Sequence, residues 1–315
     1  FMIKVDSLKK YYHKSSLFGK VRTVRALDGV SFWIKRGESL GVVGESGCGK
    51  STLALSLMGL NNPIEGKIEI DGTDIASLKK EELRLFRKNM SIVLQDSLGS
   101  LNPKMRCGDI VSEPARIFHD LSKEEIKEKT ITAFEQVGLS AEYLKRYPHE
   151  LSGGQRQRIN IARAIILKPK FTIFDEPVSS LDVSVQAQIL NLLSDLRENS
   201  EMTSIMISHN LSVIRFLCDS VAVFYLGKVV EYASVNHIFE RALHPYTQSL
   251  LDSSFDTSKI NGSFAAIEGD IPSPENPPSG CAFHPRCPRK MNICSEIAPC
   301  EKTIDGAKVF CHLYQ

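Results

Sequence analysis

The stretch Gly44-Glu-Ser-Gly-Cys-Gly-Lys50-Ser51-Thr52 determines how the neighbouring parts of the chain can be interpreted. It follows an apolar run at residues 39–43, which predicts a buried strand, and it precedes an apolar pattern at residues 52–59, which predicts a helix. The spacing fits G-x-x-x-x-G-K-S, in which glycines let backbone N–H groups turn toward an anion and the helix N-terminus adds positive potential. The sequence therefore predicts a phosphate-binding loop.

The side chains of this loop have distinct expected roles. We assign Lys50 to the β- and γ-phosphates of a nucleotide, the Ser51 hydroxyl to Mg²⁺, and Thr52 to a further phosphate hydrogen bond. The alternative is a glycine-rich turn with an exposed lysine, which the flanking strand and helix make the weaker interpretation. The residues expected to surround the phosphates are Gly44, Glu45, Ser46, Gly47, Cys48, Gly49, Lys50, Ser51 and Thr52.

Composition is that of an ordinary globular chain. Its 315 residues are 42% hydrophobic, enough for one large domain or a domain with an extension. The net charge of +2 comes from 39 basic and 37 acidic residues, and no basic run indicates a nucleic-acid surface. No apolar segment is long enough to span a bilayer, and no signal-peptide pattern opens the sequence. We therefore expect a cytoplasmic protein that contacts a membrane only through a partner.

Polar residues end three further apolar runs that predict strands. Gln95 follows residues 91–94, and its amide could bind the metal or the attacking water. Asp175 and Glu176 end the run at 170–174; Asp175 suits the Mg²⁺ shell, and Glu176 suits a general base that orients water onto the γ-phosphorus. His209 follows residues 204–208 and is assigned a γ-phosphate contact. A solvated acidic turn and a structural histidine are the alternatives.

A second glycine-rich segment, Leu151-Ser-Gly-Gly-Gln155, opens a helical pattern at residues 156–167. Backbone N–H groups at a helix N-terminus form an anion-binding site, here without a lysine, although a simple helix cap would look the same. A purine ring can stack on an aromatic face, so Tyr11 or Tyr12 could hold adenine, and we favour Tyr12; packing on the sheet is the alternative.

Other segments predict the surrounding architecture. Residues 2–40 alternate short apolar stretches with turns, as an antiparallel sheet edge does, and residues 61–75 predict a small sheet. The segment 97–113 is rich in turn residues and predicts an exposed contact surface. Residues 122–137 predict a helix that opens with a capping box of Ser122 and Glu125 and belongs to a helical subdomain.

Taken together, GESGCGKS, Gln95, LSGGQ, FDEP, SSLD and His209, in this order, resemble the ATP-binding cassette ATPase family over residues 2 to about 235. The resemblance implies an α/β fold with a RecA-like P-loop NTPase core, an antiparallel β subdomain and a helical subdomain at about 96–168. Residues 236–315 would form a Cys-rich C-terminal extension.

The same resemblance implies a dimer of cassettes. Ser152, Gly153, Gly154 and Gln155 of one subunit would cover the ATP held by the loop of the other, and Asp182 would help to pair the subunits. Glu176 would polarise the water, His209 would fix the γ-phosphate geometry, and Gln95 would link the site to a membrane partner.

The C-terminal part resembles a narrower group. Residues 243–251, which contain His-Pro-Tyr, a proline-rich connector at 271–278, and residues 280–288 are similar to oligopeptide and dipeptide importer ATPases. The amino-acid sequences of residues 95–105 and 175–193 resemble those of the F subunit of these importers.

That narrower resemblance implies an ATPase subunit on the cytoplasmic face of the membrane that drives peptide uptake. Its partners would be a D-type ATPase subunit, with a homodimer in isolation as the alternative, two membrane permeases and, indirectly, an external peptide-binding protein. A cassette acting on ribosomes or nucleic acid is the alternative function.

Five of the eight cysteines fall within residues 281–315. In a reducing compartment such clustering indicates metal ligation before disulfides, and the absence of paired C-x-x-C motifs disfavours zinc. Thiolates on a loop-rich tail suit an iron–sulfur cluster, and the resemblance implies a [4Fe-4S] cluster there. It also implies that Cys311, rather than Cys300, is the fourth ligand. The expected ligands are Cys281, Cys287, Cys294 and Cys311, with zinc or free thiols as alternatives.

Overall fold

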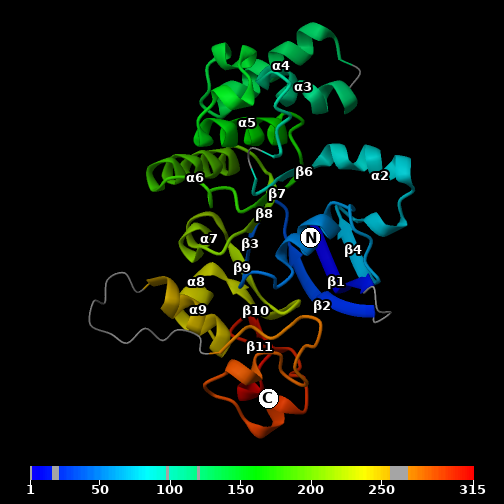
Figure 1. Cartoon of the computed structure of the whole chain (residues 1–315), viewed down its shortest axis with the longest axis vertical. Helices are drawn as coiled ribbons and strands as arrows, with labels where there is room; N and C mark the ends of the chain where they lie inside the picture. Colours follow the sequence, from blue (N-terminus) through cyan, green and yellow to red (C-terminus); the bar gives the residue numbers. More distant parts are fainter. Residues whose placement is uncertain (1, 16–20, 97–98, 119–120, 256–268) are drawn as a thin grey trace. The chain divides into compact units, whose positions relative to one another are not determined.

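The computed structural model describes residues 2–15, 21–96, 99–118, 121–255 and 269–315. The chain divides into two compact units, one made of residues 1–76 and 207–315 and the other of residues 77–206. We call these unit 1 and unit 2 and describe each by itself. In Figure 1 unit 2 runs from cyan to yellow-green along the chain, whereas unit 1 holds the blue beginning and the yellow-to-red end.

Unit 1 contains an antiparallel sheet built from the N-terminal strands. Its order is β2-β1-β4-β5, and Ile3 lies between Ile34 of β2 and Ile70 of β4. These isoleucines are buried, because alternate side chains of each strand face the core. The expected small sheet at residues 61–75 is thus part of the same sheet as residues 2–40. The strands are β1 (Ile3–Ser15), β2 (Val21–Ile34), β4 (Glu65–Ile70) and β5 (Thr73–Asp74).

A second sheet in unit 1 carries the phosphate-binding loop. Within this unit its order is β11-β12-β10-β9-β3, and β3 runs parallel to β9. Every residue of β3 is buried, as its apolar run predicts. Its strands are β3 (Ser39–Val43), β9 (Ser220–Tyr225), β10 (Lys228–Ser234), β11 (Lys302–Ile304) and β12 (Ala307–Val309). The helices of unit 1 are α1 (Lys50–Leu57), α7 (Leu211–Leu217), α8 (Val235–Arg241) and α9 (Pro245–Phe255).

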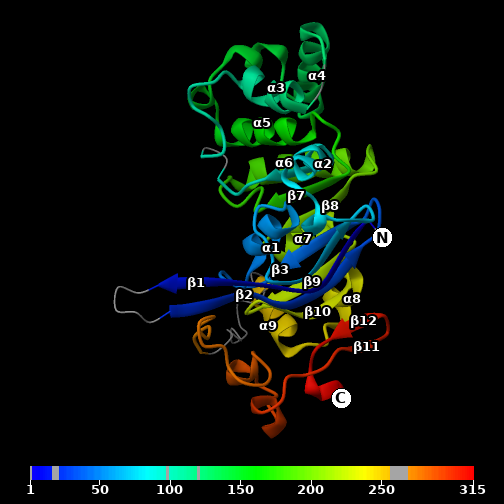
Figure 2. The same cartoon turned by 90° about the vertical axis from the view of Figure 1, so that its right-hand side faces the viewer.

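The C-terminal tail belongs to unit 1. Its strand β12 pairs with β10 through Glu231 and Val309, and the Tyr314 hydroxyl donates to the Leu243 carbonyl over 2.9 Å. Figures 1 and 2 both show the orange and red end of the chain beside α9 and β10. Sequence analysis places no strand in this tail, because β11 and β12 are only three residues long each.

Unit 2 combines parallel strands with helices. Its strand order is β8-β7-β6, and β6 and β7 are parallel. The strands are β6 (Met90–Val93), β7 (Phe171–Asp175) and β8 (Thr203–Ile207). The last residue of β8, Ile207, already belongs to unit 1. The helices are α2 (Lys80–Phe86), α3 (Cys107–Phe118), α4 (Lys123–Gln136), α5 (Gly153–Ile165) and α6 (Val183–Glu198).

Two predictions for unit 2 have different outcomes. The Ser122–Glu125 capping box at the start of α4 is confirmed, with the Glu125 N–H donating to Ser122 Oγ over 3.2 Å. The contact surface predicted at 97–113 is wrong for its second half, because residues 107–113 are helical and Ile110 and Val111 are buried. Tertiary packing of this apolar face outweighs the turn residues before it. Residues 97 and 98 lie outside the described part of the chain.

Short 3-10 turns complete the described structure. They are Ile75–Ser77, Arg87–Asn89, Ala141–Lys145, Pro148–Glu150, His284–Arg286, Asn292–Ser295 and His312–Tyr314. Among the residues that the structure describes, none of the helices combines the length and the apolar character needed to span a membrane.

Candidate functional site

The glycines of the loop between β3 and α1 have conformations that other residues rarely adopt. Gly44, Gly47 and Gly49 have φ of 150°, 79° and 107°. A Cβ on Gly49 would lie 2.2 Å from the Ala26 carbonyl oxygen, and a Cβ on Gly44 would lie 2.2 Å from the Phe224 carbonyl oxygen. Both contacts are with backbone, which cannot move aside as a flexible side chain can. The loop geometry therefore requires glycine at both positions.

The Lys50 ammonium group lies against the loop that it follows in the sequence. Its Nζ donates to the carbonyl oxygens of Gly44, over 2.6 Å, and Glu45, over 3.0 Å, and lies 3.7 Å from Cys48 Sγ. The loop then enters α1, whose first turn holds Ser51 and Thr52. A lysine charge and a helix N-terminus on one glycine loop make a site for an anion with several negative charges.

Glu45, the second residue of the loop, has contacts that sequence analysis did not predict. Its N–H donates to the Tyr246 hydroxyl over 3.0 Å. Its carboxylate accepts two hydrogen bonds from Arg286, of 2.7 and 3.0 Å, which raise the pKa of the Arg286 guanidinium. Tyr246 and Arg286 belong to residues 243–251 and 280–288, which the sequence analysis noted only for their resemblance to peptide importer ATPases. In the sequence Arg286 only precedes a cysteine, and this neighbour does not indicate which group its guanidinium will bind.

The segment that carries Tyr246 is fixed by a buried carboxylate. Glu231 of β10 is fully buried, and its two oxygens accept the N–H groups of Leu243, over 2.8 Å, and His244, over 2.9 Å. His244 Nδ1 in turn accepts the Tyr246 N–H over 3.1 Å. These bonds satisfy backbone groups at the start of α9 and hold Tyr246 in the orientation that reaches Glu45.

Buried His244 makes the stability of the protein depend on pH. Burial, with a smaller effect of the Arg289 charge, lowers the His244 pKa from 6.5 to about 3. Below pH 6.5 the unfolded chain binds a proton that the folded chain excludes, so the stability contributed by His244 is lost as the pH falls from 6.5 toward 3. The expected slope reaches about 1.4 kcal/mol per pH unit.

The measurement is the free energy of unfolding in urea between pH 7.5 and 5 for the wild type and His244→Asn, whose Oδ1 can still accept the Tyr246 N–H. Burial raises the pKa of Glu231, whose contribution to stability changes in the opposite sense, but Glu231 is present in both proteins. The difference between the two curves therefore reports on His244. Parallel curves would contradict this prediction.

His209 and the two tyrosines also lie in unit 1. The N–H of Ser208 donates to the Val42 carbonyl of β3 over 3.2 Å, which places the exposed His209 beside the strand that leads into the loop. The Tyr11 hydroxyl donates to Asp28 Oδ1 over 2.6 Å, and the Tyr12 hydroxyl accepts from Asn61 over 2.8 Å. Both rings are half-buried, so the assignment of adenine to Tyr12 stays a prediction.

In unit 2 the predicted metal and base residues come together at one edge of the sheet. Val93 of β6 is paired in register with Phe174 of β7, so Gln95, which follows β6, and Asp175, the last residue of β7, lie at the carboxyl ends of neighbouring parallel strands. Asp175 is buried, whereas Gln95 is exposed. Glu176 has a left-handed φ of 51°, a strained conformation of the kind that clusters at functional sites.

The second glycine-rich segment, residues 151–155, leads into a helix as predicted, and its role in binding an anion stays a prediction. Ser152 caps α5, with its Oγ accepting the Gln155 N–H over 3.3 Å while Gln155 Oε1 accepts the Ser152 N–H over 3.0 Å. A Cβ on Gly154 would lie 2.4 Å from Val185 of α6, the helix that follows Asp182. The structure thus places the start of α5 beside the start of α6.

Four of the tail cysteines lie in one neighbourhood. Burial, and then the charges of Cys294, Cys311 and Cys287, raise the pKa of the Cys281 thiol to about 11. Cys300 is exposed. However, in the described ranges no three His, Cys, Asp or Glu side chains are arranged to hold a metal ion. The structure therefore does not support the predicted metal centre beyond the proximity of these thiols.

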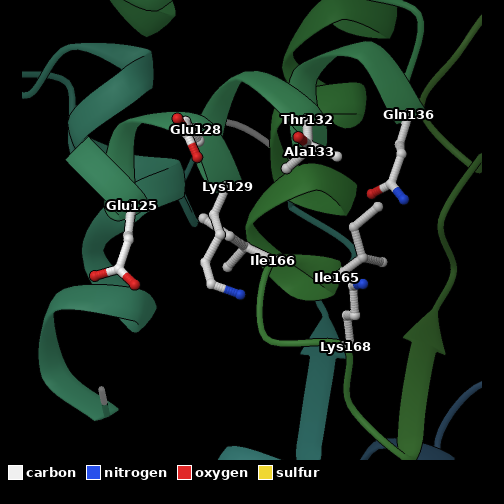
Figure 3. Close-up of a pocket in the computed structure, with 9 residues that line it drawn as sticks. All are labelled: Glu125, Glu128, Lys129, Thr132, Ala133, Gln136, Ile165, Ile166 and Lys168. Carbon is white, nitrogen blue, oxygen red and sulfur yellow. The ribbon is translucent and has the colours of Figure 1, made fainter. Parts of the chain in front are cut away.

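A surface hollow in unit 2 lies elsewhere, between α4 and the turn after α5. Figure 3 shows it lined by charged residues of α4, including Glu125 and Lys129, and by Ile165, Ile166 and Lys168. None of the predicted site residues lines it. We therefore assign it no part in nucleotide binding.

The class of protein follows from the loop geometry. A buried strand, a glycine loop with an ammonium group against it, and a helix define a nucleoside-triphosphate-binding protein of the P-loop class. Tyr12, the loop and His209 belong to unit 1, whereas Gln95, Ser152–Gln155, Asp175, Glu176 and Asp182 belong to unit 2. That they act as one site stays a prediction.

Comparisons with known proteins identify the family. Residues 27–179 match the ABC transporter family, and residues 230–294 match the family described as oligopeptide/dipeptide transporter, C-terminal region. The oligopeptide transport ATP-binding protein AppF of Bacillus subtilis is 46% identical, over 99% of this chain and 97% of its own length. The dipeptide transport ATP-binding protein DppF of Escherichia coli is 44% identical, over 98% of this chain and 93% of its own length.

Solved structures agree with the sequence comparisons. The dimeric ATP-binding cassette MJ0796, in a post-hydrolysis state with ADP and Pi, has a TM-score of 0.67 and 29% identity, over 74% of this chain and 99% of its own. The chain therefore belongs to the ABC transporter family and has the fold of its ATPase cassette.

Proposed function

We propose that this chain is the ATP-hydrolysing subunit of an importer that takes up dipeptides or oligopeptides. The observation that carries the proposal is the identity of 44–46% to peptide transport ATP-binding proteins over nearly the whole chain. The match of residues 230–294 to the oligopeptide/dipeptide transporter C-terminal region adds support, because this part lies outside the matched ABC transporter segment.

In this function the loop of unit 1 binds the phosphates of ATP. Lys50 holds the β- and γ-phosphates, Thr52 donates a further hydrogen bond, and Tyr12 stacks on adenine. Ser51, Gln95 and Asp175 would hold Mg²⁺, and the ion would supply positive charge that offsets the negative charge of the phosphates. Their hydroxyl, amide and carboxylate oxygens are suitable ligands for that ion.

Hydrolysis requires a water molecule aligned with the γ-phosphorus. Glu176 is proposed to accept its proton as the general base, and His209 to donate a hydrogen bond to the γ-phosphate. The strained φ of Glu176 and the place of His209 beside β3 support these roles. Gln95, which follows β6, would couple the metal site to the membrane partner.

A second cassette completes each site. Ser152, Gly153, Gly154 and Gln155 at the start of α5 would cover ATP held by the partner's loop, and Asp182 at the start of α6 would contact the partner. We propose a D-type ATPase subunit as that partner, two membrane permeases that the pair binds at the cytoplasmic face of the membrane, and an external peptide-binding protein that supplies the substrate. The dimeric cassette among the similar structures supports the pairing.

We also propose the domain limits expected from the sequence. Residues 2–235 would form the cassette, with a RecA-like core and a helical subdomain at about 96–168, and residues 236–315 would form the Cys-rich C-terminal region. The C-terminal family match, which begins at residue 230, supports this limit.

A [4Fe-4S] cluster on Cys281, Cys287, Cys294 and Cys311 remains part of the proposal, supported by the proximity of these thiols. Protein purified under nitrogen is expected to contain about four iron atoms per chain and to absorb near 400 nm. Cys311→Ser should lose most of this iron, and Cys300→Ser should keep it. Zinc on elemental analysis, or no metal at all, would remove the cluster from the proposal.

The alternative of a cassette acting on ribosomes or nucleic acid has no specific observation in its favour. The decisive experiment is uptake of a radiolabelled alanine tripeptide in cells that lack this chain. The wild type should restore uptake, and Lys50→Ala should not. Restored uptake by Lys50→Ala, or no uptake defect in the deleted strain, would contradict the proposed function.

A further inference from the structure

The C-terminal tail contacts the phosphate-binding loop at Glu45. The Arg286 side chain is only 5% exposed, and its Nη1 and Nη2 donate to the two oxygens of Glu45 over 2.7 and 3.0 Å. This is a bidentate pair, the strongest geometry for an arginine and a carboxylate. All atoms of the contact belong to unit 1, although the residues are 241 positions apart in the sequence.

We propose that Arg286 is a positioning residue for nucleotide binding, which neutralises and orients the Glu45 carboxylate within the phosphate-binding loop. The inference rests on the proposed function in that it takes the bound anion to be ATP. It gives the C-terminal tail a part in nucleotide binding, in addition to the proposed cysteine ligands.

The electrostatic reason is the charge of Glu45. A carboxylate in a loop that binds phosphates repels the nucleotide, and in a partly buried place that repulsion is weakly screened. The guanidinium of Arg286 offsets the charge, so the field at the loop is dominated by Lys50 and the N-terminus of α1. Without Arg286, no guanidinium would offset the negative charge of Glu45 in the loop.

The second reason is the shape of the loop. The Glu45 N–H is held by the Tyr246 hydroxyl, its carbonyl accepts from Lys50 Nζ, and its carboxylate is held by Arg286. Every polar group of the residue is therefore occupied by a defined partner. A residue fixed in this way holds the following N–H groups of the loop in a single arrangement, which lowers the entropy lost on binding.

Arg286 is itself held by a buried aromatic anchor. Phe283 is 1% exposed, and its ring centroid lies 5.2 Å from that of Tyr225 and 5.3 Å from that of Tyr246. The Arg286 N–H donates to the Phe283 carbonyl over 3.0 Å, which closes the 3-10 turn. The turn lies between Cys281 and Cys287, so the segment that bears these cysteines is the one that fixes Arg286.

The test is equilibrium binding of magnesium AMP-PNP to the full-length chain by calorimetry. Arg286→Gln is expected to raise Kd about tenfold, which corresponds to about 1.4 kcal/mol. Glu45→Gln should raise it less, and the double variant should resemble Glu45→Gln, because the uncompensated charge is then absent. Arg286→Lys keeps the positive charge but cannot form the bidentate pair, so its Kd should lie between those of the wild type and Arg286→Gln.

Two controls make the test specific. Arg289→Gln removes the same charge from the same tail, but Arg289 donates to Gln248 of α9 and not to the loop, so it should bind like the wild type. Unfolding temperatures without nucleotide would separate a binding defect from a folding defect.

The outcomes distinguish this inference from the proposed function. If the wild type binds no AMP-PNP, the proposed function fails. If the wild type binds and Arg286→Gln binds equally well, or if the two single variants are additive in the double variant, the positioning role of Arg286 is wrong while the proposed function stands.

Discussion

Glu176→Gln is expected to lower the ATP turnover of the assembled transporter by about 10²- to 10⁴-fold, because a general base contributes roughly that factor. Glutamine has the same length and shape but cannot accept the proton of the attacking water. ATP binding should remain, since the loop residues of unit 1 are unchanged. The variant should therefore accumulate as a closed dimer with ATP bound.

The backbone at this residue makes glutamine the informative substitution. Glu176 has φ of 51°, and its carbonyl accepts the Ser179 N–H over 3.4 Å and the Ser179 hydroxyl over 3.1 Å. Glycine would relax this conformation and change the turn as well as the carboxylate. Glutamine keeps the conformational cost and removes only the charge.

Steady-state phosphate release and size-exclusion chromatography with ATP measure both consequences. The matched control is Glu201→Gln, an exposed carboxylate before β8 that belongs to the same unit and should leave turnover unchanged. Turnover within a few-fold of the wild type in Glu176→Gln would remove Glu176 from the role of base.

Gly49→Ala is expected to weaken nucleotide binding by about 10²-fold, the loss that a displacement of about 1 Å in a binding group can cause. The new Cβ would lie 2.2 Å from the Ala26 carbonyl oxygen in β2, closer than any real contact, so the loop must shift. Gly49 also has φ of 107° and caps α1, so the shift would move the helix N-terminus that faces the anion.

Gly72→Ala is the matched control for this substitution. Gly72 has φ of 77°, but a Cβ there meets no atom within 4 Å, so it adds backbone strain without displacing a neighbour. Both variants should lose some stability, roughly 1–2 kcal/mol from the left-handed conformation. Only Gly49→Ala should lose binding of magnesium AMP-PNP. Equal losses of binding in the two variants would contradict the steric explanation.

Much of the architecture could be predicted because it depends on local patterns. The all-buried strand β3, the helix after it, and the Ser122 capping box follow from apolar runs and short-range hydrogen bonds. Helix α3 was not predicted, because turn residues precede it and its buried face is recognised only against α4 and α5. The antiparallel sheet could be predicted as segments but not as one sheet, since pairing of β1 with β4 is nonlocal.

The sequence by itself determined the glycine loop after β3, the glycine-rich start of α5 and the carboxylates at the end of β7, because each is defined by residue types at fixed short spacings. Only the tertiary structure decided that Arg286 and Tyr246 hold Glu45, and that Glu231 holds the segment that presents Tyr246. The Arg286 contact comes from the C-terminal tail, whose strand β12 pairs with β10. A contact across 241 residues leaves no periodic pattern in the sequence, because it is specified by the packing of Phe283 and its neighbours and not by spacing along the chain.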